Sequence, residues 1–450
     1  PEGCPKAARR LPVSCPKAAR RLKQAAKVKT TPYTIIMTPM FYILVGLIIL
    51  DYIIGRTLSV LNAKYDTKPV PECIRDIYSD EKRERQLHFA QAGRRFSWIL
   101  NTVENLAILL MILLGGYRFL DELIHGWCNA IVHPLLNPIV MAALFFLILS
   151  ILSRLLNLPF DIYHTFGIMK DFGFNKTTPK TFTLDILKSM GLNILITTLI
   201  LAAVVSIYMQ IPDWFWLLAW AVVSAFSLFM SYFYSQLIVP LFNKQTPLPE
   251  GKLRDAIKDL AGKSNFSLRD IYVMDSSKRS TIANAYFTGF GRRRRIVLYD
   301  TLIEQLTTDE ITAVLAHEIG HYRHRHTLKS IIVSLVTSLL MFYLLGLTLK
   351  YNLCADALGC VASFHVNMYF FYTLYTPIET LLSLAGNALS RRHEYQADNY
   401  TKQCGVAEAQ ITALKKLSGN SLSNPTPHPA FVFFHYSHPT LVDRINNLKL

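Results

Sequence analysis

The residues His317-Glu318-Ile319-Gly320-His321 have the types and the spacing found in zinc-dependent hydrolases. On an α-helix, side chains four residues apart lie on one face, about 6 Å apart along the axis, so both imidazoles can bind one metal ion. Glu318 lies about 100° around the helix from His317 and about 60° from His321. It therefore stands beside the metal without being needed as a ligand, which suits a general base for a zinc-bound water.

The flanking sequence predicts the helix that this spacing needs. Thr307 and Glu310 form a T-x-x-E capping box, and Asp309 adds negative charge to the first turn. An apolar stripe then follows at helical spacing, formed by Ile311, Val314, Leu315 and Ile319. A chance match to the motif is the alternative, and the capped helix favours the metal site.

Two histidines leave a catalytic zinc short of ligands, because such a site has three protein ligands and one open position. Glu394 is the best third candidate. If residues 387–398 are helical, Asn387, Glu394 and Asp398 share one face, at i, i+7 and i+11. Glu394 is then expected to bind the metal, while Asp398 orients a histidine N–H and Asn387 lies alongside. The alternative is a surface helix with ordinary charges.

The other histidines near these motifs are not expected to bind metal. His393 points away from the face that carries Glu394. His324 and His326 are expected to be solvated residues at the membrane edge.

Composition indicates a membrane protein. The 450 residues are 51% hydrophobic and only 17% charged, with a mean hydropathy of +0.27, whereas soluble domains have about a quarter charged residues. Seven stretches are long enough to cross about 30 Å of hydrocarbon: 33–54, 96–117, 138–156, 190–211, 214–239, 328–349 and 364–389.

Polar residues inside these stretches need an explanation. The last stretch contains Asn367, Pro377, Glu379 and Asn387, so a long buried helix is the alternative to a seventh span. The second stretch contains Asn101, Glu104 and Asn105. These groups either pair within a tight bundle or line a water-filled interior.

The net charge of +16 follows the membrane segments rather than one nucleic-acid-binding patch. Nine Lys and Arg residues lie between the first two spans and four between the third and fourth, whereas Arg118 alone lies between the second and third. By the positive-inside rule, the basic loops face the cytoplasm. Region 240–327, with the metal motif, and the C-terminal tail are then cytoplasmic too.

The first thirty residues do not fit this topology. They carry nine Lys and Arg, and they repeat the sequence CPKAARRL at 4–11 and 15–22. A low-complexity or non-native tail is favoured over a targeting peptide. The expected organisation is therefore a leader at 1–30, an N-terminal membrane domain with five helices at 31–239, and a metalloprotease domain with two further spans at 240–450.

The seven cysteines contain no C-x-x-C pair, so they do not form a metal framework. Cys354 and Cys360 fall in the loop between the last two spans, on the non-cytoplasmic side, where a disulfide is one option. Cys73 and Cys404 are expected to be reduced thiols.

Together, three segments resemble the type I CAAX prenyl proteases, which are membrane-integral zinc metalloproteases: HEIGH at 317–321, the S-R-x-x-E-x-x-A-D core at 390–398, and HYSHPTLVDRI at 435–445. Further matches are LPFDIY at 158–163, FGFNK at 172–176, VPLFNK at 239–244, NAYFTG at 284–289 and RIVLYDTL at 295–302. The resemblance covers about residues 33–450.

The resemblance implies an α-helical integral membrane protein. About seven transmembrane helices would form a barrel around a chamber, beside a mainly helical metalloprotease domain with a small β edge. It implies one Zn²⁺ per chain and removal of the last three residues after a prenylated cysteine. It also implies the endoplasmic reticulum membrane, or the nuclear envelope in animals, with the site facing the cytosol. The expected partners are prenylated C-termini and the lipid bilayer, not nucleic acid, and the expected state is a monomer.

Two further groups of residues are expected to handle the substrate. His438 and Arg444 match family motif positions and are candidates to donate to the tetrahedral oxyanion. The alternative for them is a helix-capping histidine and a surface arginine. An edge strand is predicted at Asn284, Ala285 and Tyr286. An extended peptide could join this strand, or it could be an ordinary sheet edge.

Two other functions compete with the prenyl-tail protease. A membrane zinc protease for quality control would degrade misfolded proteins regardless of prenylation, but that class has fewer spans before its metal motif than the five expected here. A transporter or receptor with a vestigial motif is disfavoured because Glu318 and Glu394 are both present.

Overall fold

The structure, a computed structural model, describes residues 38–264, 266, 268–288 and 294–450. Within these residues, six helices are long and apolar enough to cross a membrane: α2 (Pro39–Lys64), α3 (Asp80–Leu113), α5 (Asn137–Tyr163), α7 (Pro179–Gln210), α8 (Phe215–Leu237) and α13 (His326–Tyr351). They coincide with the first six predicted spans. The basic leader and the start of the first predicted span lie outside the described residues.

The seventh predicted span is part of a longer helix, α15 (Phe364–Gln403), which is not among the six membrane candidates. Asn367 is one of the polar residues of α15, and its side chain makes hydrogen bonds to nearby backbone groups. The Asn367 Oδ1 accepts hydrogen bonds from the backbone N–H groups of Cys354 and Ala355, at 3.0 and 3.1 Å. The helix then continues to Glu394 and Asp398, so one rigid element connects the membrane region to the predicted metal site.

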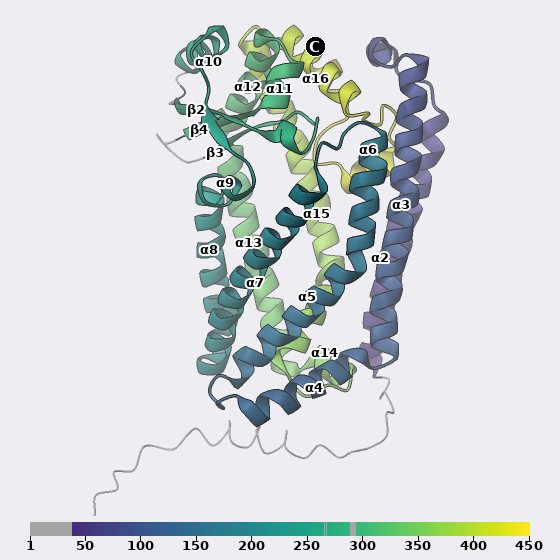
Figure 1. The fold of residues 1–450 in the computed structure, drawn as a ribbon, viewed down its shortest axis with the longest axis vertical. Coiled ribbons are helices and arrows are strands. Elements are labelled where there is room, and N and C mark those ends of the chain that lie inside the picture. Colours follow the sequence, from purple (N-terminus) through teal and green to yellow (C-terminus); the bar gives the residue numbers. More distant parts are fainter. Residues whose placement is uncertain (1–37, 265, 267, 289–293) are drawn as a thin grey trace, which may run out of the picture.

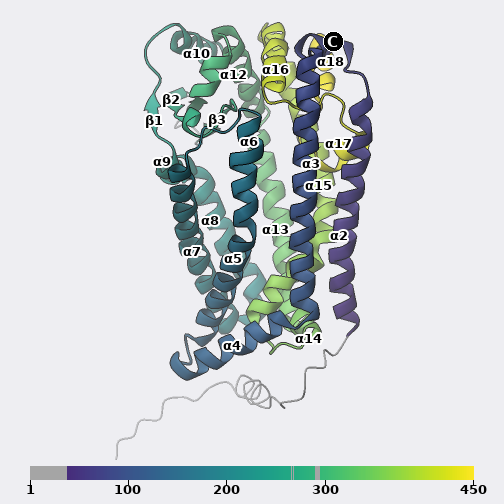
Figure 2. The ribbon, with the colours of Figure 1, turned by 45° about the vertical axis from the view of Figure 1, so that its right-hand side comes forward.

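Shorter helices complete the chain: α4 (Gly116–Ile131), α6 (Met169–Asp171), α9 (Val239–Phe242), α10 (Lys252–Lys263), α11 (Asp300–Gln305), α12 (Thr308–Arg323), α14 (Leu353–Ala357), α16 (Ala407–Asn420), α17 (Pro429–His435) and α18 (Leu441–Lys449). The predicted metalloprotease elements gather at one end of the long helices, and α4 and α14 lie at the other (Figures 1 and 2).

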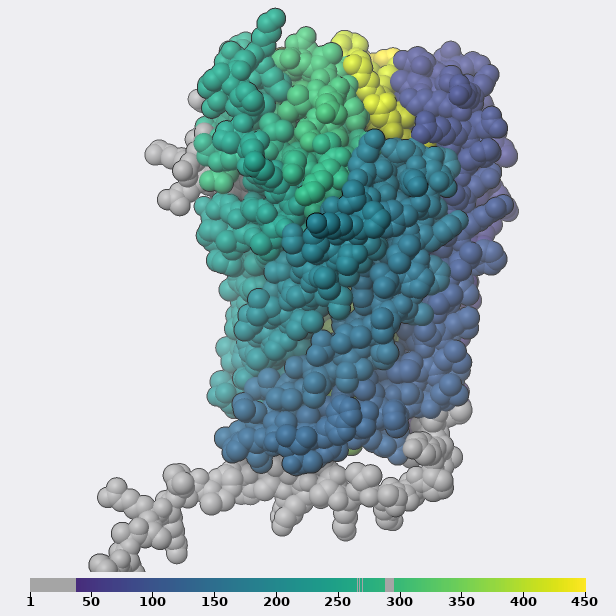
Figure 3. All heavy atoms as spheres, in the orientation of Figure 1, coloured from purple at the N-terminus to yellow at the C-terminus, as the bar shows by residue number. Residues whose placement is uncertain are grey.

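The long helices run side by side between these two ends of the molecule (Figures 1 and 2). In each of the six candidate spans, only 6–17% of the membrane window is buried. A helix that packs one face on a solid core would bury roughly a third of its residues. Figure 3 shows openings beside α5 through which atoms of later segments are visible. The inner faces are therefore only partly covered, which agrees with the expected chamber.

A small sheet lies in the predicted metalloprotease region, with strand order β1-β2-β4-β3. The strands are β1 (Gln245–Pro247), β2 (Leu268–Met274), β3 (Ala285–Thr288) and β4 (Arg294–Tyr299). β2 and β4 are parallel, and β1 and β3 pair antiparallel to them. β3 is therefore an edge strand, as the sequence predicts.

The loop between α2 and α3 packs on the metalloprotease region. Ile74 and Tyr78 form an apolar cluster with Ile411 and Ile445. The Tyr78 hydroxyl also donates a hydrogen bond to the carbonyl oxygen of Ser423, at 2.7 Å. The first basic loop and the predicted metal motif therefore lie at the same end of the molecule, as the charge pattern predicts.

The option of a disulfide between Cys354 and Cys360 is not realised, because both thiols are free. The Cys354 side chain is buried in an apolar cluster that also contains Tyr117, Ile124 and Phe370. Cys360 packs against the outside of this cluster.

Candidate metal centre

Helix α12 carries both motif histidines and begins with the predicted capping box. The Glu310 N–H donates to Thr307 Oγ1 at 3.3 Å, and the Thr307 N–H donates to Glu310 Oε2 at 2.8 Å. Lys416 of α16 adds an ion pair to the Glu310 carboxylate at 2.8 Å. Burial opposes ionisation of Glu310, but the bonds from Lys416 and Thr307 outweigh it and hold its pKa below the ordinary value.

Gly320 allows α12 to cross close to α15. A Cβ atom at this position would lie 3.0 Å from Ala397 Cα and 3.0 Å from Tyr400 Cβ. A larger residue would therefore push the two helices apart. This close crossing places the His317 and His321 face of α12 opposite Glu394 of α15.

Three donor atoms form a compact triangle at this crossing. The Nε2 atoms of His317 and His321 lie 3.1 Å apart. Glu394 places Oε2 3.3 Å from His317 Nε2 and Oε1 3.3 Å from His321 Nε2. Ligands of a tetrahedral zinc at about 2.0–2.2 Å are separated by roughly 3.3–3.6 Å, so the triangle has the size of one face of such a site.

The chemical types of the three donor groups also suit the binding of a cation. Glu394 Oε2 is buried and accepts no hydrogen bond, although His317 Nε2 lies 3.3 Å and Arg444 Nη1 3.5 Å from it. An unsatisfied buried carboxylate oxygen is costly unless a positive charge compensates it. Burial opposes ionisation of Glu394, yet His317, His321 and Arg444 hold its pKa well below the ordinary value. The three residues together could hold a metal ion.

Asp398 holds His317 from the side away from this triangle, as the sequence predicts. The Nδ1 atom of His317 lies 2.9 Å from Asp398 Oδ1. With Nε2 facing the triangle, Nδ1 is placed to donate a hydrogen bond to this carboxylate. Asp398 is fully buried and also accepts two hydrogen bonds from Arg444.

Glu318 lies outside the group of three donors that could hold a metal. It is partly exposed and close enough to Arg444 to interact electrostatically with it. The role of Glu318 as a general base stays a prediction.

The prediction for His326 is wrong, because its side chain is buried rather than solvated at the membrane edge. Only 3% of the residue is exposed. Its Nδ1 lies 3.0 Å from Nδ1 of His321, and its Nε2 lies 2.8 Å from Gln396 Oε1. Arg325 adopts a left-handed conformation with φ 55°, and this turn directs the start of α13 back toward His321.

His393 is also buried, and its ring stacks on that of His326 with a centroid distance of 3.9 Å. Sequence reasoning missed this packing around His321. The available signal was the group of three histidines at the end of α12 and the start of α13, directly before an apolar run.

Asn387, expected to lie alongside Asp398, has its hydrogen-bond partner elsewhere. Its side-chain amide donates to the carbonyl oxygen of Phe434 at 2.9 Å. Arg391, one turn further along α15, donates to the carbonyl oxygen of Tyr436 at 2.6 Å. The reason for the difference is that α17 and the following loop cover this face of α15. Asn387 and Arg391 therefore hold in place the segment that leads to His438.

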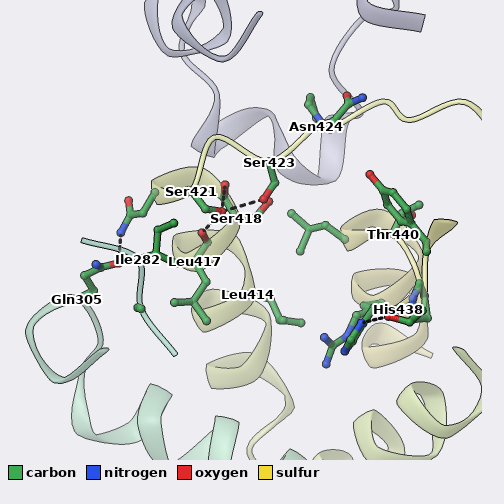
Figure 4. A pocket seen from close by; sticks show the side chains of 18 of the residues that line it. Ile282, Gln305, Leu414, Leu417, Ser418, Ser421, Ser423, Asn424, His438 and Thr440 are labelled. Atoms are coloured by element: carbon green, nitrogen blue, oxygen red, sulfur yellow. Dashed lines mark hydrogen bonds between the residues drawn. The ribbon is translucent and has the colours of Figure 1, made fainter. Parts of the chain in front are cut away.

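His438 lies at the open side of the site. Its side chain is 63% exposed, and its Nε2 atom lies 3.3 Å from Glu394 Oε1. Its Nδ1 atom lies 3.0 Å from the Ser437 hydroxyl. A pocket of about 520 Å³ adjoins this side, bounded by residues 281–283, by α16 and by the loop with His438 (Figure 4).

The edge strand β3 starts beside this pocket. Asn284 is exposed, and its side-chain oxygen accepts the N–H of Ala285 at 2.8 Å. The Tyr286 hydroxyl lies 3.3 Å from both Ser235 Oγ and Gln245 Nε2, which ties the strand to α8 and β1. One edge of β3 pairs with β4 and the other is the outer edge of the sheet.

Comparisons with known proteins agree with this geometry. A family model described as CAAX prenyl protease N-terminal, five membrane helices, matches residues 59–244, and the model of peptidase family M48 matches residues 247–450. The CAAX prenyl protease 1 homolog of Oryza sativa subsp. japonica is 35% identical over 413 residues, covering 89% of this chain and 95% of that relative. The chain belongs to the CAAX prenyl protease 1 family.

Other members of the CAAX prenyl protease 1 family show the same relationship. The Homo sapiens homolog is 32% identical over 427 residues, covering 85% of this chain and 89% of its own length. The crystal structure of S. mikatae Ste24p superimposes with a TM-score of 0.84 at 31% identity, covering 91% of this chain and 99% of that chain. This chain is accordingly a multi-pass membrane metalloendopeptidase, and the resemblance noted from its motifs is confirmed.

Proposed function

We propose that this protein is a zinc-dependent endoprotease that hydrolyses prenylated CAAX-tail proteins and releases the C-terminal tripeptide after the prenylcysteine. The printed names of the relatives support the substrate class, because the rice and human proteins are CAAX prenyl protease 1 homologs. The observation that carries the proposal is the triangle of His317, His321 and Glu394 at one end of the long helices. The endoplasmic reticulum membrane is the proposed location, with the site facing the cytosol.

His317, His321 and Glu394 would hold the zinc ion. Zinc, when bound, polarises a carbonyl group and makes a water molecule more acidic. Asp398 keeps the proton of His317 on Nδ1, so Nε2 presents its lone pair to the metal. Glu318 accepts a proton from the attacking water at its carboxylate and passes it to the leaving amine.

His438 is proposed to donate to the oxygen that becomes negatively charged during hydrolysis. Its exposed ring can meet a substrate in the adjoining pocket, which a buried side chain could not do. Arg444 is proposed to act differently, because its guanidinium group is buried and bound to Asp398. Its contacts favour a role in positioning His317 over the oxyanion role expected from the sequence.

The peptide part of the substrate is proposed to add as a strand to the outer edge of β3 at Asn284, Ala285 and Tyr286. Strand addition supplies main-chain hydrogen bonds without demanding particular side chains. The bonds that Tyr286 makes with α8 and β1 support a fixed position for this edge. The apolar prenyl group would enter the membrane-embedded chamber below it.

Digestion of a farnesylated tail peptide beside its unprenylated twin tests the proposal. The purified full-length protein should release the tripeptide from the farnesylated peptide and act much more slowly on the twin. The Glu318→Gln variant, which should keep its zinc, is the matched control for contaminating proteases. Equal cleavage of both peptides would instead indicate a quality-control protease that does not recognise prenylation.

A further inference from the structure

A second cluster of metal-ligand side chains lies at the opposite end of the long helices. Asp121 and His125 are on α4, and His365 is in the first turn of α15. Figure 1 places α4 and α14 at the bottom of the molecule, whereas α12 and α16 lie at the top. The cluster is therefore separate from the catalytic triangle, which sits further along the same helix α15.

The three side chains converge on one point. His365 Nε2 lies 2.7 Å from Asp121 Oδ1, and His125 Nδ1 lies 3.3 Å from the same oxygen. One ligand atom from each residue lies within 4.8 Å of the other two. Donors around a tetrahedral zinc are separated by roughly 3.3–3.6 Å, so side-chain adjustments of about an ångström would complete the geometry. Among the described residues, this group and the catalytic triangle are the two that meet this criterion.

The cluster contains a buried carboxylate group, and the charge of a buried carboxylate has to be compensated. Asp121 is 0% exposed and His365 is 2% exposed. A carboxylate buried to this extent is compensated by a proton on a neighbouring histidine or by a cation.

Surrounding contacts hold each ligand in place, as is usual around protein metal ions. The second oxygen of Asp121, Oδ2, accepts the backbone N–H of Val361 at 3.1 Å. His125 Nδ1 also lies 2.9 Å from the Asp121 carbonyl oxygen, which fixes the orientation of the ring. The ring of His365 packs on Phe145 with a centroid distance of 4.7 Å.

We propose that Asp121, His125 and His365 form a second, structural site for a divalent transition metal of the zinc type. Two imidazoles and one carboxylate are the same ligand set as in the catalytic triangle, and imidazole favours zinc over magnesium or calcium. A water molecule would complete the coordination, or the sulfur of the neighbouring Cys360 after its proton is released to solvent. Binding would replace the proton between His365 and Asp121, which is released to solvent.

The site would fasten α4 to the start of α15. Outside these contacts, α4 is a short helix that does not cross the membrane by length and composition. A metal that links α4 to α15 adds its binding free energy to the folded state, because the ligands are not assembled in the unfolded chain. We therefore expect the second metal to stabilise the closed end of the barrel without taking part in hydrolysis.

Zinc stoichiometry of the purified full-length protein tests this proposal. After dialysis against a weak chelator, we expect the wild type to keep two zinc ions per chain by elemental analysis. The His317→Ala/His321→Ala double variant should keep one, and the His365→Gln variant should also keep one. The exposed His133, replaced by Gln, is the matched control and should leave two. One zinc in the wild type that disappears with the catalytic histidines would overturn the proposal.

A second measurement tests the proposal even if the His365 variant fails to fold. Zinc titrated into the metal-free His317→Ala/His321→Ala protein should raise its thermal midpoint by several degrees, because a ligand that binds only the folded state stabilises it. Adding Asp121→Asn should abolish this rise. An unchanged midpoint in the double variant, at zinc levels that saturate the wild type, would show that the cluster is only a hydrogen-bond network. Neither result depends on the proposed peptidase substrate.

Discussion

Arg444 holds Asp398 through two parallel hydrogen bonds. Its Nε donates to Asp398 Oδ2 at 2.9 Å, and its Nη2 donates to Oδ1 at 2.7 Å. The same Asp398 Oδ1 lies 2.9 Å from Nδ1 of His317. The C-terminal helix α18 is therefore connected, through two side chains, to the orientation of His317 on α12, a proposed metal ligand.

Replacing Arg444 with Lys should weaken zinc binding about 10- to 100-fold, a loss typical for partners that orient metal ligands. Lysine keeps the positive charge but cannot make the two-point contact with the Asp398 carboxylate. Zinc affinity can be measured by competition with a coloured chelator. The exposed Lys449 on the same helix, replaced by Ala, should behave as wild type. A loss of turnover at unchanged zinc affinity would instead assign Arg444 to the oxyanion.

Replacing His438 with Ala should reduce kcat about 100-fold and leave the zinc content unchanged, because one donor to the oxyanion is lost. The Ser437→Ala variant removes only the partner of Nδ1 and should have a smaller effect. Turnover of a farnesylated peptide and metal analysis on the same preparation check this. Loss of zinc in the His438 variant would make it a metal ligand, since its Nε2 already lies 3.3 Å from Glu394.

Replacing Glu318 with Gln should lower kcat by a factor of about 100 to 10,000 while zinc stays bound. The change removes the base and spares the three donor atoms of the triangle. Elemental analysis and single-turnover cleavage of a farnesylated peptide separate the two properties. Near-normal cleavage in this variant would exclude Glu318 as the base.

Much of the metal site could be predicted because helical spacing is a local property of the chain. The positions of His317, His321 and Glu394 follow from two helices that cross, and Gly320 shows where they cross. The capping box at Thr307 was predictable for the same reason, since it involves residues three apart.

Contacts between distant segments could not be predicted in this way. His326 is buried because a left-handed turn at Arg325 reverses the chain, and no pattern in the sequence specifies that conformation. Asn387 bonds to the backbone of α17, which is more than forty residues away. The seventh span was uncertain because the polar residues of α15 lower its hydropathy while serving neighbours such as α14.

Replacing Glu310 with Gln should destabilise the protein by about 1 kcal/mol at pH 7, since the charged partner of Lys416 in the capping box is lost. The folded-state pKa of Glu310 is lower than its unfolded value, so its stabilisation is present above the unfolded value. It is lost as the pH falls through the folded-state pKa. Thermal unfolding at several pH values should therefore show wild type and variant converging in acid. A difference that stays constant with pH would contradict this account.

The proposed orientation in the membrane predicts which surface cysteines react in sealed microsomes. Lys252 is exposed at the start of α10, at the end of the molecule that carries α12, and His133 is exposed just after α4, the helix at the opposite end. A Lys252→Cys variant should react with an impermeant maleimide before detergent is added, in excess of labelling of the native cysteines. A His133→Cys variant should react only after the membrane is opened. The charge distribution gives the reason, because the Lys- and Arg-rich loops lie at the Lys252 end. The reverse labelling pattern would put the site in the lumen, where prenylated cytosolic tails could not reach it.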